Sequence, residues 1–162
     1  MFLNTHTSKD RLKIWRDLRN DTSHSLDSII ESFSQIKVCP RFIDYYTPKS
    51  WPTPFEIVSE GYLCHSGITL VLLSTLLHKG FILKGEIDLC VISNNINGET
   101  GLVGIQNNKV YNFDRNKVVD LDYVKDNATI FHNNKLHTDL ISYWHLNSFK
   151  LQYKLGKYIY GF

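Results

Sequence analysis

Apolar residues recur at three- and four-residue steps in two segments near the start of the chain, and this spacing predicts two amphipathic helices. The first covers residues 8–18, with Trp15 among the apolar positions and lysines and arginines on the other face. The second covers residues 25–36, with an aspartate near its first turn. We expect the first helix to bury its tryptophan and to present a basic outer face.

All four prolines then fall within residues 40–54, interleaved with Tyr45, Tyr46 and Trp51. Proline cannot donate a backbone hydrogen bond and restricts the residue before it to extended shapes. The segment is therefore predicted to be an ordered, aromatic-rich loop. Loops of this kind wall binding clefts, and they also cover a core where no helix or strand does so.

The next segment has strong helix signals. Thr53 to Glu56 reads as a capping box with proline at the first helical position, and the short helix is expected to run to Gly61. Cys64 follows, before a run at 68–77 that is apolar on nearly all faces and that predicts a buried central helix. Gly80 is a natural C-terminal cap for it.

Three short runs beyond this helix, residues 87–93, 101–106 and 109–113, are rich in β-branched and aromatic residues and predict an antiparallel sheet. Asn107 and Asn108 between the last two predict a tight hairpin. Residues 118–124 alternate aspartates with apolar residues, which predicts an edge strand or a loop.

The tail, residues 139–160, carries apolar and aromatic residues at mixed helical spacing together with a series of lysines. This pattern predicts a closing helix with a solvated basic edge. The alternative is a basic and aromatic docking surface for a protein or a nucleic acid.

Composition narrows the class of protein. With 162 residues, 43% of them hydrophobic, the chain has the size and make-up of one globular domain, residues 1–162. A net charge of +2 does not by itself indicate a nucleic acid or an anionic membrane as partner. The N-terminus lacks the pattern of a signal peptide, and no apolar run reaches membrane-spanning length. We expect a cytoplasmic protein that does not bind a membrane.

Three cysteines, Cys39, Cys64 and Cys90, are an odd number without the spacing of a zinc site or a small disulfide scaffold. Reduced thiols are therefore expected. No glycine-rich phosphate loop and no zinc-binding helix motif is present in the sequence, so we expect neither a cofactor nor a metal.

The middle of the chain resembles the transglutaminase-like superfamily, especially its bacterial cysteine peptidases. The likeness lies in the Trp-x-Thr-Pro-x-Glu pattern at 51–56, followed by Gly61, Cys64 and the pair Gly80–Phe81 at similar distances. It covers about residues 25–115, so that 1–24 and 116–162 are peripheral additions. The resemblance implies an α+β, papain/transglutaminase-like fold, in which N-terminal helices and a central buried helix pack on a small antiparallel sheet.

The family's chemistry uses a thiolate at a helix N-terminus, a histidine on a following strand and an Asp or Asn that orients the histidine. By resemblance, Cys64 is the nucleophile and Asp114 or Asn112 is the orienting residue. The expected histidine is missing, because residues 100–102 at its place are Thr-Gly-Leu. A substitute base would have to come from His65, next to the cysteine, or from His132 or His137 in the Asn-rich segment after the sheet. Each of these histidines is expected at an ordinary surface or loop position.

Three functions follow, and they remain open from the sequence. The first is a catalytically degenerate protein that binds a protein partner through a cleft. This cleft would be lined by Tyr45, Tyr46, Trp51 and His65. The richness in Asn, Lys, Ile and Tyr is similar to that of AT-biased genomes, including those of many phages, and would make the partner a host factor. The second is a divergent cysteine peptidase or amidase with a relocated base. The third is a nucleic-acid-binding protein that uses the basic N-terminal helix and the tail.

Overall fold

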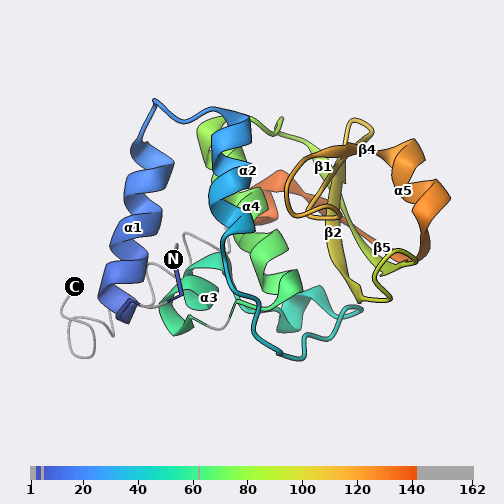
Figure 1. The fold of residues 1–162 in the computed structure, drawn as a ribbon, viewed down its shortest axis with the longest axis horizontal. Coiled ribbons are helices and arrows are strands. Elements are labelled where there is room, and N and C mark those ends of the chain that lie inside the picture. The colour runs from blue at the N-terminus through green and yellow to red at the C-terminus, as the bar shows by residue number, and fades with distance from the viewer. Residues whose placement is uncertain (1–2, 5, 62, 142–162) are drawn as a thin grey trace.

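The computed structural model describes residues 3–4, 6–61 and 63–141. It is an α+β fold in which helices pack on a five-stranded antiparallel sheet (Figure 1). The helices are α1 Ser8–Asn20, α2 Leu26–Ser34, the 3-10 turn η1 Pro48–Ser50, α3 Pro54–Glu60, α4 His65–Lys79 and α5 Leu121–Asn127. The strands are β1 Glu86–Asn94, β2 Thr100–Gln106, β3 Lys109–Tyr111, β4 Val119–Asp120 and β5 Ala128–His137.

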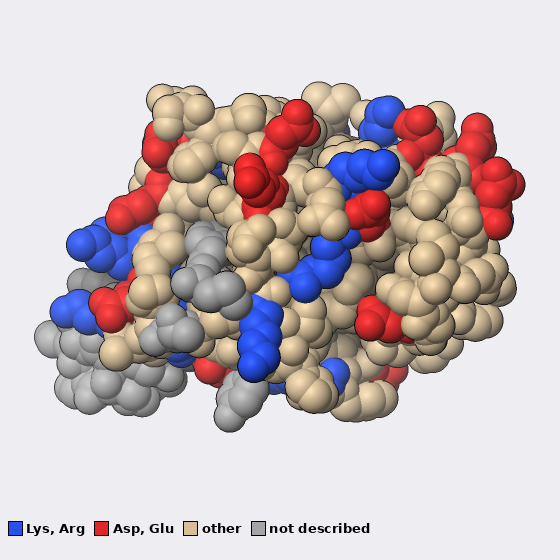
Figure 2. Space-filling model, in the orientation of Figure 1, with Lys and Arg blue, Asp and Glu red and all other residues tan. Residues whose placement is uncertain are grey.

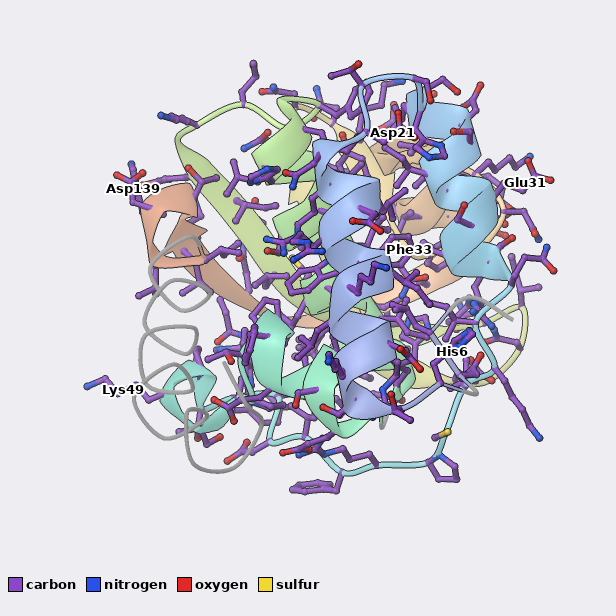
Figure 3. All side chains as sticks on the ribbon, turned by 90° about the vertical axis from the view of Figure 1, so that its left-hand side faces the viewer. His6, Asp21, Glu31, Phe33, Lys49 and Asp139 are labelled. Atoms are coloured by element: carbon purple, nitrogen blue, oxygen red, sulfur yellow. The ribbon has the colours of Figure 1, made fainter. Side chains whose placement is uncertain are left out.

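The two predicted N-terminal helices are confirmed, and both have side-chain caps. The hydroxyl of Thr7 accepts the Asp10 N–H at the start of α1, and Ser25 does the same for Ser28 at the start of α2. Trp15 is fully buried, and its indole N–H donates to the Thr75 hydroxyl of α4 at 2.9 Å. In Figure 3, α1 stands in front of α4, which it helps to bury.

The predicted boundaries of α3 and α4 are also confirmed. The Thr53 hydroxyl accepts the Glu56 N–H, as the N-cap of a capping box does, and it also donates to the Glu56 carboxylate. Gly61 and Gly80 end the two helices in the left-handed conformation, with φ of 75° and 80°, where glycine has no steric penalty. Helix α4 begins three residues before the apolar run, at His65, with Cys64 as its N-cap.

The sheet has the order β4-β3-β2-β1-β5 and lies between two apolar cores. Side chains of one face, such as Val91 and Leu102, pack with α1 to α4 in the larger core. Alternate side chains, such as Ile92 and Val103, join Val124 of α5 in the smaller core on the opposite face. Successive side chains of a strand point to opposite faces, and here both faces are buried. This is why the central strands have nearly continuous apolar sequences.

Two predictions for the part after the hairpin hold in part. Of residues 118–124, Val119–Asp120 form the predicted edge strand, and α5 begins at Leu121, because Leu121 and Val124 bury one helical face together. The Asn-rich segment that holds His132 and His137 is no loop but β5, a largely exposed strand of the same sheet that pairs antiparallel with β1. Of the predicted tail helix, the residues after Ile141 lie outside the described residues.

Three cations bind the C-terminal carbonyls of helices to which they do not belong. The Arg11 guanidinium donates to Val58 and Ser59 of α3, at 2.9 and 2.6 Å. The Lys79 ammonium donates to the Leu18 carbonyl of α1 and to that of Asp21. The Arg115 guanidinium donates to the Phe33 and Ile36 carbonyls at the end of α2. These contacts complement the negative helix ends and tie the helices together.

Two of the basic side chains of α1 therefore make contacts within the fold. Arg11 holds α3, and the Arg19 guanidinium lies 4.1 Å from the ring centroid of Trp15, where burial lowers its pKa to about 10. On the face shown in Figure 2, positive and negative side chains are interspersed. This face thus gives no support for a nucleic acid as partner.

Candidate functional site

The Cys64 thiol lies at the N-terminus of α4, as the sequence predicts. Cys64 is only 5% exposed and belongs to the larger core, and its Sγ accepts the Gly67 N–H at 3.3 Å. The sulfur therefore does the work of the serine or threonine oxygen that usually caps a helix. A Cβ at Gly67 would lie 3.4 Å from this sulfur, so the turn is closely packed around it.

A nucleophilic thiol needs a base, and no described histidine is hydrogen-bonded to the Cys64 sulfur. Within the described residues, the hydrogen bond of the sulfur is to Gly67, and no imidazole nitrogen forms one with it. His132 lies on β5, where its Nε2 is 3.1 Å from Asn134 Oδ1, and His137 pairs with Asp139 at the end of that strand. Neither histidine completes a thiol–imidazole pair.

The imidazole of His65 packs over Gly101, at the strand position where the resemblance expects a histidine. A Cβ built on Gly101 would lie 2.7 Å from His65 Cδ2. The imidazole of His65, from the neighbouring helix α4, therefore fills the space that a side chain at position 101 would occupy. Burial lowers the pKa of His65; Glu99 opposes this shift and Arg115 adds to it. His65 is thus a neutral, half-buried side chain at neutral pH.

At the part of β2 that extends beyond β3, side chains from the start of α4 bond the backbone of β2 where a neighbouring strand would otherwise do so. The last residue pair of β2 with β3 is Gly104 with Tyr111, so Leu102 lies beyond the end of β3. There the Ser66 hydroxyl accepts the Leu102 N–H at 3.1 Å, and the Thr69 hydroxyl donates to the Leu102 carbonyl at 2.7 Å. Sequence analysis did not identify Ser66 and Thr69; polar residues three apart in an otherwise apolar helix were the available signal.

Asn112, one of the two predicted orienting residues, is buried against this turn. Its backbone has a positive φ of 66°, which asparagine tolerates better than most residues. Its side-chain amide donates to the His65 carbonyl at 3.2 Å and to the Thr69 hydroxyl at 2.9 Å. Asp114, the other candidate, accepts the Asn116 N–H in a local turn. In the described residues, neither side chain is hydrogen-bonded to an imidazole nitrogen.

The aromatic residues of the proline-rich loop divide into anchors and one exposed ring. Trp51 is 6% exposed and belongs to the core, where its indole N–H donates to the Asp44 carbonyl. The Tyr45 hydroxyl donates to the Thr100 carbonyl at 3.3 Å. Tyr46 is 58% exposed, with its ring centroid 5.1 Å from that of His132. The loop is thus ordered, and of the three predicted rings only Tyr46 is largely exposed.

A small cavity lies beside His65, between the turn of α4 and the ends of β1 and β2. Its lining includes Glu99, Gly101 and Phe113, and its volume of about 10 Å³ is the room that one water molecule needs. A peptide side chain does not fit there. His65, the fourth residue of the predicted cleft, borders this small cavity.

Three further observations bear on function. Within the described residues, no three His, Cys, Asp or Glu side chains lie together as a metal ion would require. No helix of that part of the chain is long and apolar enough to cross a membrane. No protein-family model matches this sequence, and a search of curated proteins gives no match either.

Proposed function

We propose that this chain is a catalytically silent protein with a transglutaminase-like architecture and that it acts as a protein-binding module. One observation carries the proposal. At the N-terminus of α4, Cys64 caps the helix through the Gly67 N–H, and Gly101 leaves the expected place of a catalytic imidazole to the packed ring of His65. General acid–base assistance, typically worth about 10²–10⁴-fold, is then missing.

The arrangement of elements supports the architectural part of the proposal. The capped helix α3, Gly61, the Cys64 N-cap and the buried helix α4 follow one another as the resemblance implies, and α4 packs on an antiparallel sheet. Under this proposal, the fold derives from an enzyme and has kept the packing of that enzyme but has lost the catalytic histidine.

The proline-rich loop provides the surface that we assign to the partner. Phe42 is 85% exposed and Tyr46 is also largely exposed, whereas the loop between them is held by Asp44. The Asp44 carboxylate accepts the Tyr46 N–H and the Thr47 hydroxyl. Aromatic rings presented by an ordered loop bind a protein at low entropic cost, and such rings are frequent hot spots. A host factor is the expected partner if the chain comes from a phage.

Affinity capture with matched variants tests this function. The full chain should retain a stoichiometric protein partner, and the F42A/Y46A variant should lose it. Ile96→Ala is the control, because Ile96 is a similarly exposed apolar residue in the turn between β1 and β2. Absence of a stoichiometric partner, together with hydrolase activity that Cys64→Ser abolishes, would refute the proposal.

A divergent cysteine enzyme is the second candidate, because a neutral imidazole does lie over Gly101, supplied by the residue next to Cys64. Alkylation rates at neutral pH separate the two functions. A silent protein labels fastest at the partly exposed Cys39, while Cys64 is buried and burial raises the pKa of Cys90 to about 11. An enzyme labels fastest at Cys64, and His65→Ala slows that reaction.

A further inference from the structure

Strand β5 forms an edge of the sheet, and no described strand pairs with its outer side. It is ten residues long, and within the described residues it pairs only with β1. Its exposed apolar side chains are Ile130 and Phe131, the latter 56% exposed, and Tyr46 adjoins the strand through His132. A long edge with exposed apolar residues is a template for another strand.

The pairing with β1 fixes which residues of β5 share a face. His132 lies opposite Val91, which faces the larger core, and Asn133 lies opposite Cys90, which faces the smaller one. Ile130 lies opposite Ile92, so that Phe131 is an extra residue, a β-bulge. From residue 132 onward the strand is regular, and odd-numbered residues face the side of α5.

We propose that β5 pairs with β5 of a second copy of this chain, antiparallel about a two-fold axis at Asn133, so that the two sheets become one. The proposal goes beyond the proposed function and does not depend on it. The two-fold axis must pass through a residue, because residues directly opposite each other have to face the same side of the sheet. Only a few centres are then available along the regular part of β5.

Charge and burial select among these centres. An axis at Lys135 would place two lysines opposite each other, and an axis at His132 would do the same with two histidines. Asn134 is buried, and its amide already donates to the carbonyls of Tyr45 and Leu89. Asn133 is exposed, and its amide can serve both as donor and as acceptor toward its own copy.

The register centred on Asn133 is also complementary beyond the axis. It places His132 across from Asn134, and it brings the bulged Phe131, at the end of this regular run, near Lys135 of the second copy, twice by symmetry. A lysine against an aromatic ring is a favourable cation–π pair, and no like charges are opposed. Within one copy, Lys135 lies across from Asp88 on β1, so the pairing brings together no uncompensated lysines.

The bulge and Lys135 explain why this edge does not pair indiscriminately. Bulges and edge lysines are the devices by which natural sheets discourage unwanted strand pairing. Here the bulge at Phe131 limits the regular run, and Lys135 disfavours the registers that oppose two lysines. The same features therefore select one partner, a second β5.

Sedimentation equilibrium of the full chain tests the proposal. The 18.9 kDa chain should approach twice this mass as its concentration rises from about 1 to about 500 µM. Phe131→Lys opposes two lysines at each symmetric position and should raise the dissociation constant about tenfold or more, whereas Phe131→Glu forms two ion pairs and should change it less than about threefold. Phe42→Lys, at another exposed aromatic residue, should leave association unchanged.

Two results would overturn the pairing. The first is a monomer over the whole concentration range. The edge would then be exposed to solvent, or covered by a strand of another protein or by another segment of the chain. The second is an equal loss with Phe131→Lys and Phe131→Glu, because it indicates general apolar contact. Amide exchange provides a separate readout: protection of residues 131–135 should increase with concentration, and circular dichroism should show that both variants are folded.

Discussion

Two of the edge segments that lack a neighbouring strand in the described residues are treated in opposite ways. Beyond the end of β3, the backbone of Leu102 is bonded by Ser66 and Thr69 of α4, and Asn112 fixes that turn in place. Among the described strands, none pairs with the outer edge of β5. The first edge is closed by side chains of the fold itself, and the second is the edge that we propose to pair with a second copy.

The difference bears on the role that we propose for the first turn of α4. At the first turn of α4, the polar side chains of Cys64, Ser66 and Thr69 each hold a backbone group of the helix or of β2. Buried polar groups that are hydrogen-bonded in this way rigidify the fold, and leaving their partners unsatisfied is costly. At β5, by contrast, side chains such as Phe131 and Asn133 are exposed and free to recognise something else.

The largest effect that we expect comes from the same substitution made in both regions. Asn112→Asp removes the two donors to His65 and Thr69 and buries a carboxylate, which should lower the free energy of unfolding by about 3 kcal/mol. Asn133→Asp, on the exposed edge, should change it by less than about 0.5 kcal/mol at low protein concentration. Urea denaturation measures both, and equal costs would erase the distinction between the two edges.

The next effect tests the packing of His65 on Gly101. Gly101→Ala places a methyl group 2.7 Å from His65 Cδ2 and should cost about 2 kcal/mol of unfolding free energy. In a His65→Ala background the same change should cost less than about 0.5 kcal/mol, because the clashing ring is gone. If the cost is the same in both backgrounds, the imidazole does not occupy this space.

Local signals in the sequence were enough to predict the elements around α4. The capping box at Thr53, the glycines that end α3 and α4, and the Asn107–Asn108 turn each depend on backbone rules that act within a few residues. Both asparagines of that turn have positive φ, as a tight hairpin requires.

The edges of the sheet could not be predicted in this way. Strand β5 carries Asn133, Asn134 and Lys135 in sequence because only one of its sides is paired and much of it faces solvent, so its pattern resembles that of a loop. The alternation at 118–124 fits a strand and a helix equally well, and the packing of Leu121 and Val124 decides for α5. The bonds from Ser66 and Thr69 to Leu102 join residues more than 30 positions apart, which no local rule anticipates.

A smaller effect distinguishes a capping sulfur from a nucleophile at Cys64. Cys64→Ala removes the acceptor for the Gly67 N–H and should lower the free energy of unfolding by about 1 kcal/mol, whereas Cys64→Ser keeps an acceptor and should cost less. Urea denaturation of the two variants gives this order. A larger loss for serine than for alanine would show that the site selects an apolar atom rather than a cap.

The smallest effect concerns the pH dependence of stability. Because burial lowers the pKa of His65 in the folded state, the unfolded chain takes up a proton there at a higher pH than the fold does. The contribution of His65 is therefore complete above the unfolded pKa of about 6.5 and is lost as the pH falls toward the folded pKa. His65→Asn cannot titrate, so its stability should decrease less between about pH 7.5 and pH 5 than that of the natural chain. Coinciding slopes would mean that the ring is as easily protonated in the fold as outside it. That result would make proton transfer by His65 at the first turn of α4 a possibility again. The contrast between this turn and the exposed edge of β5 would then be weaker.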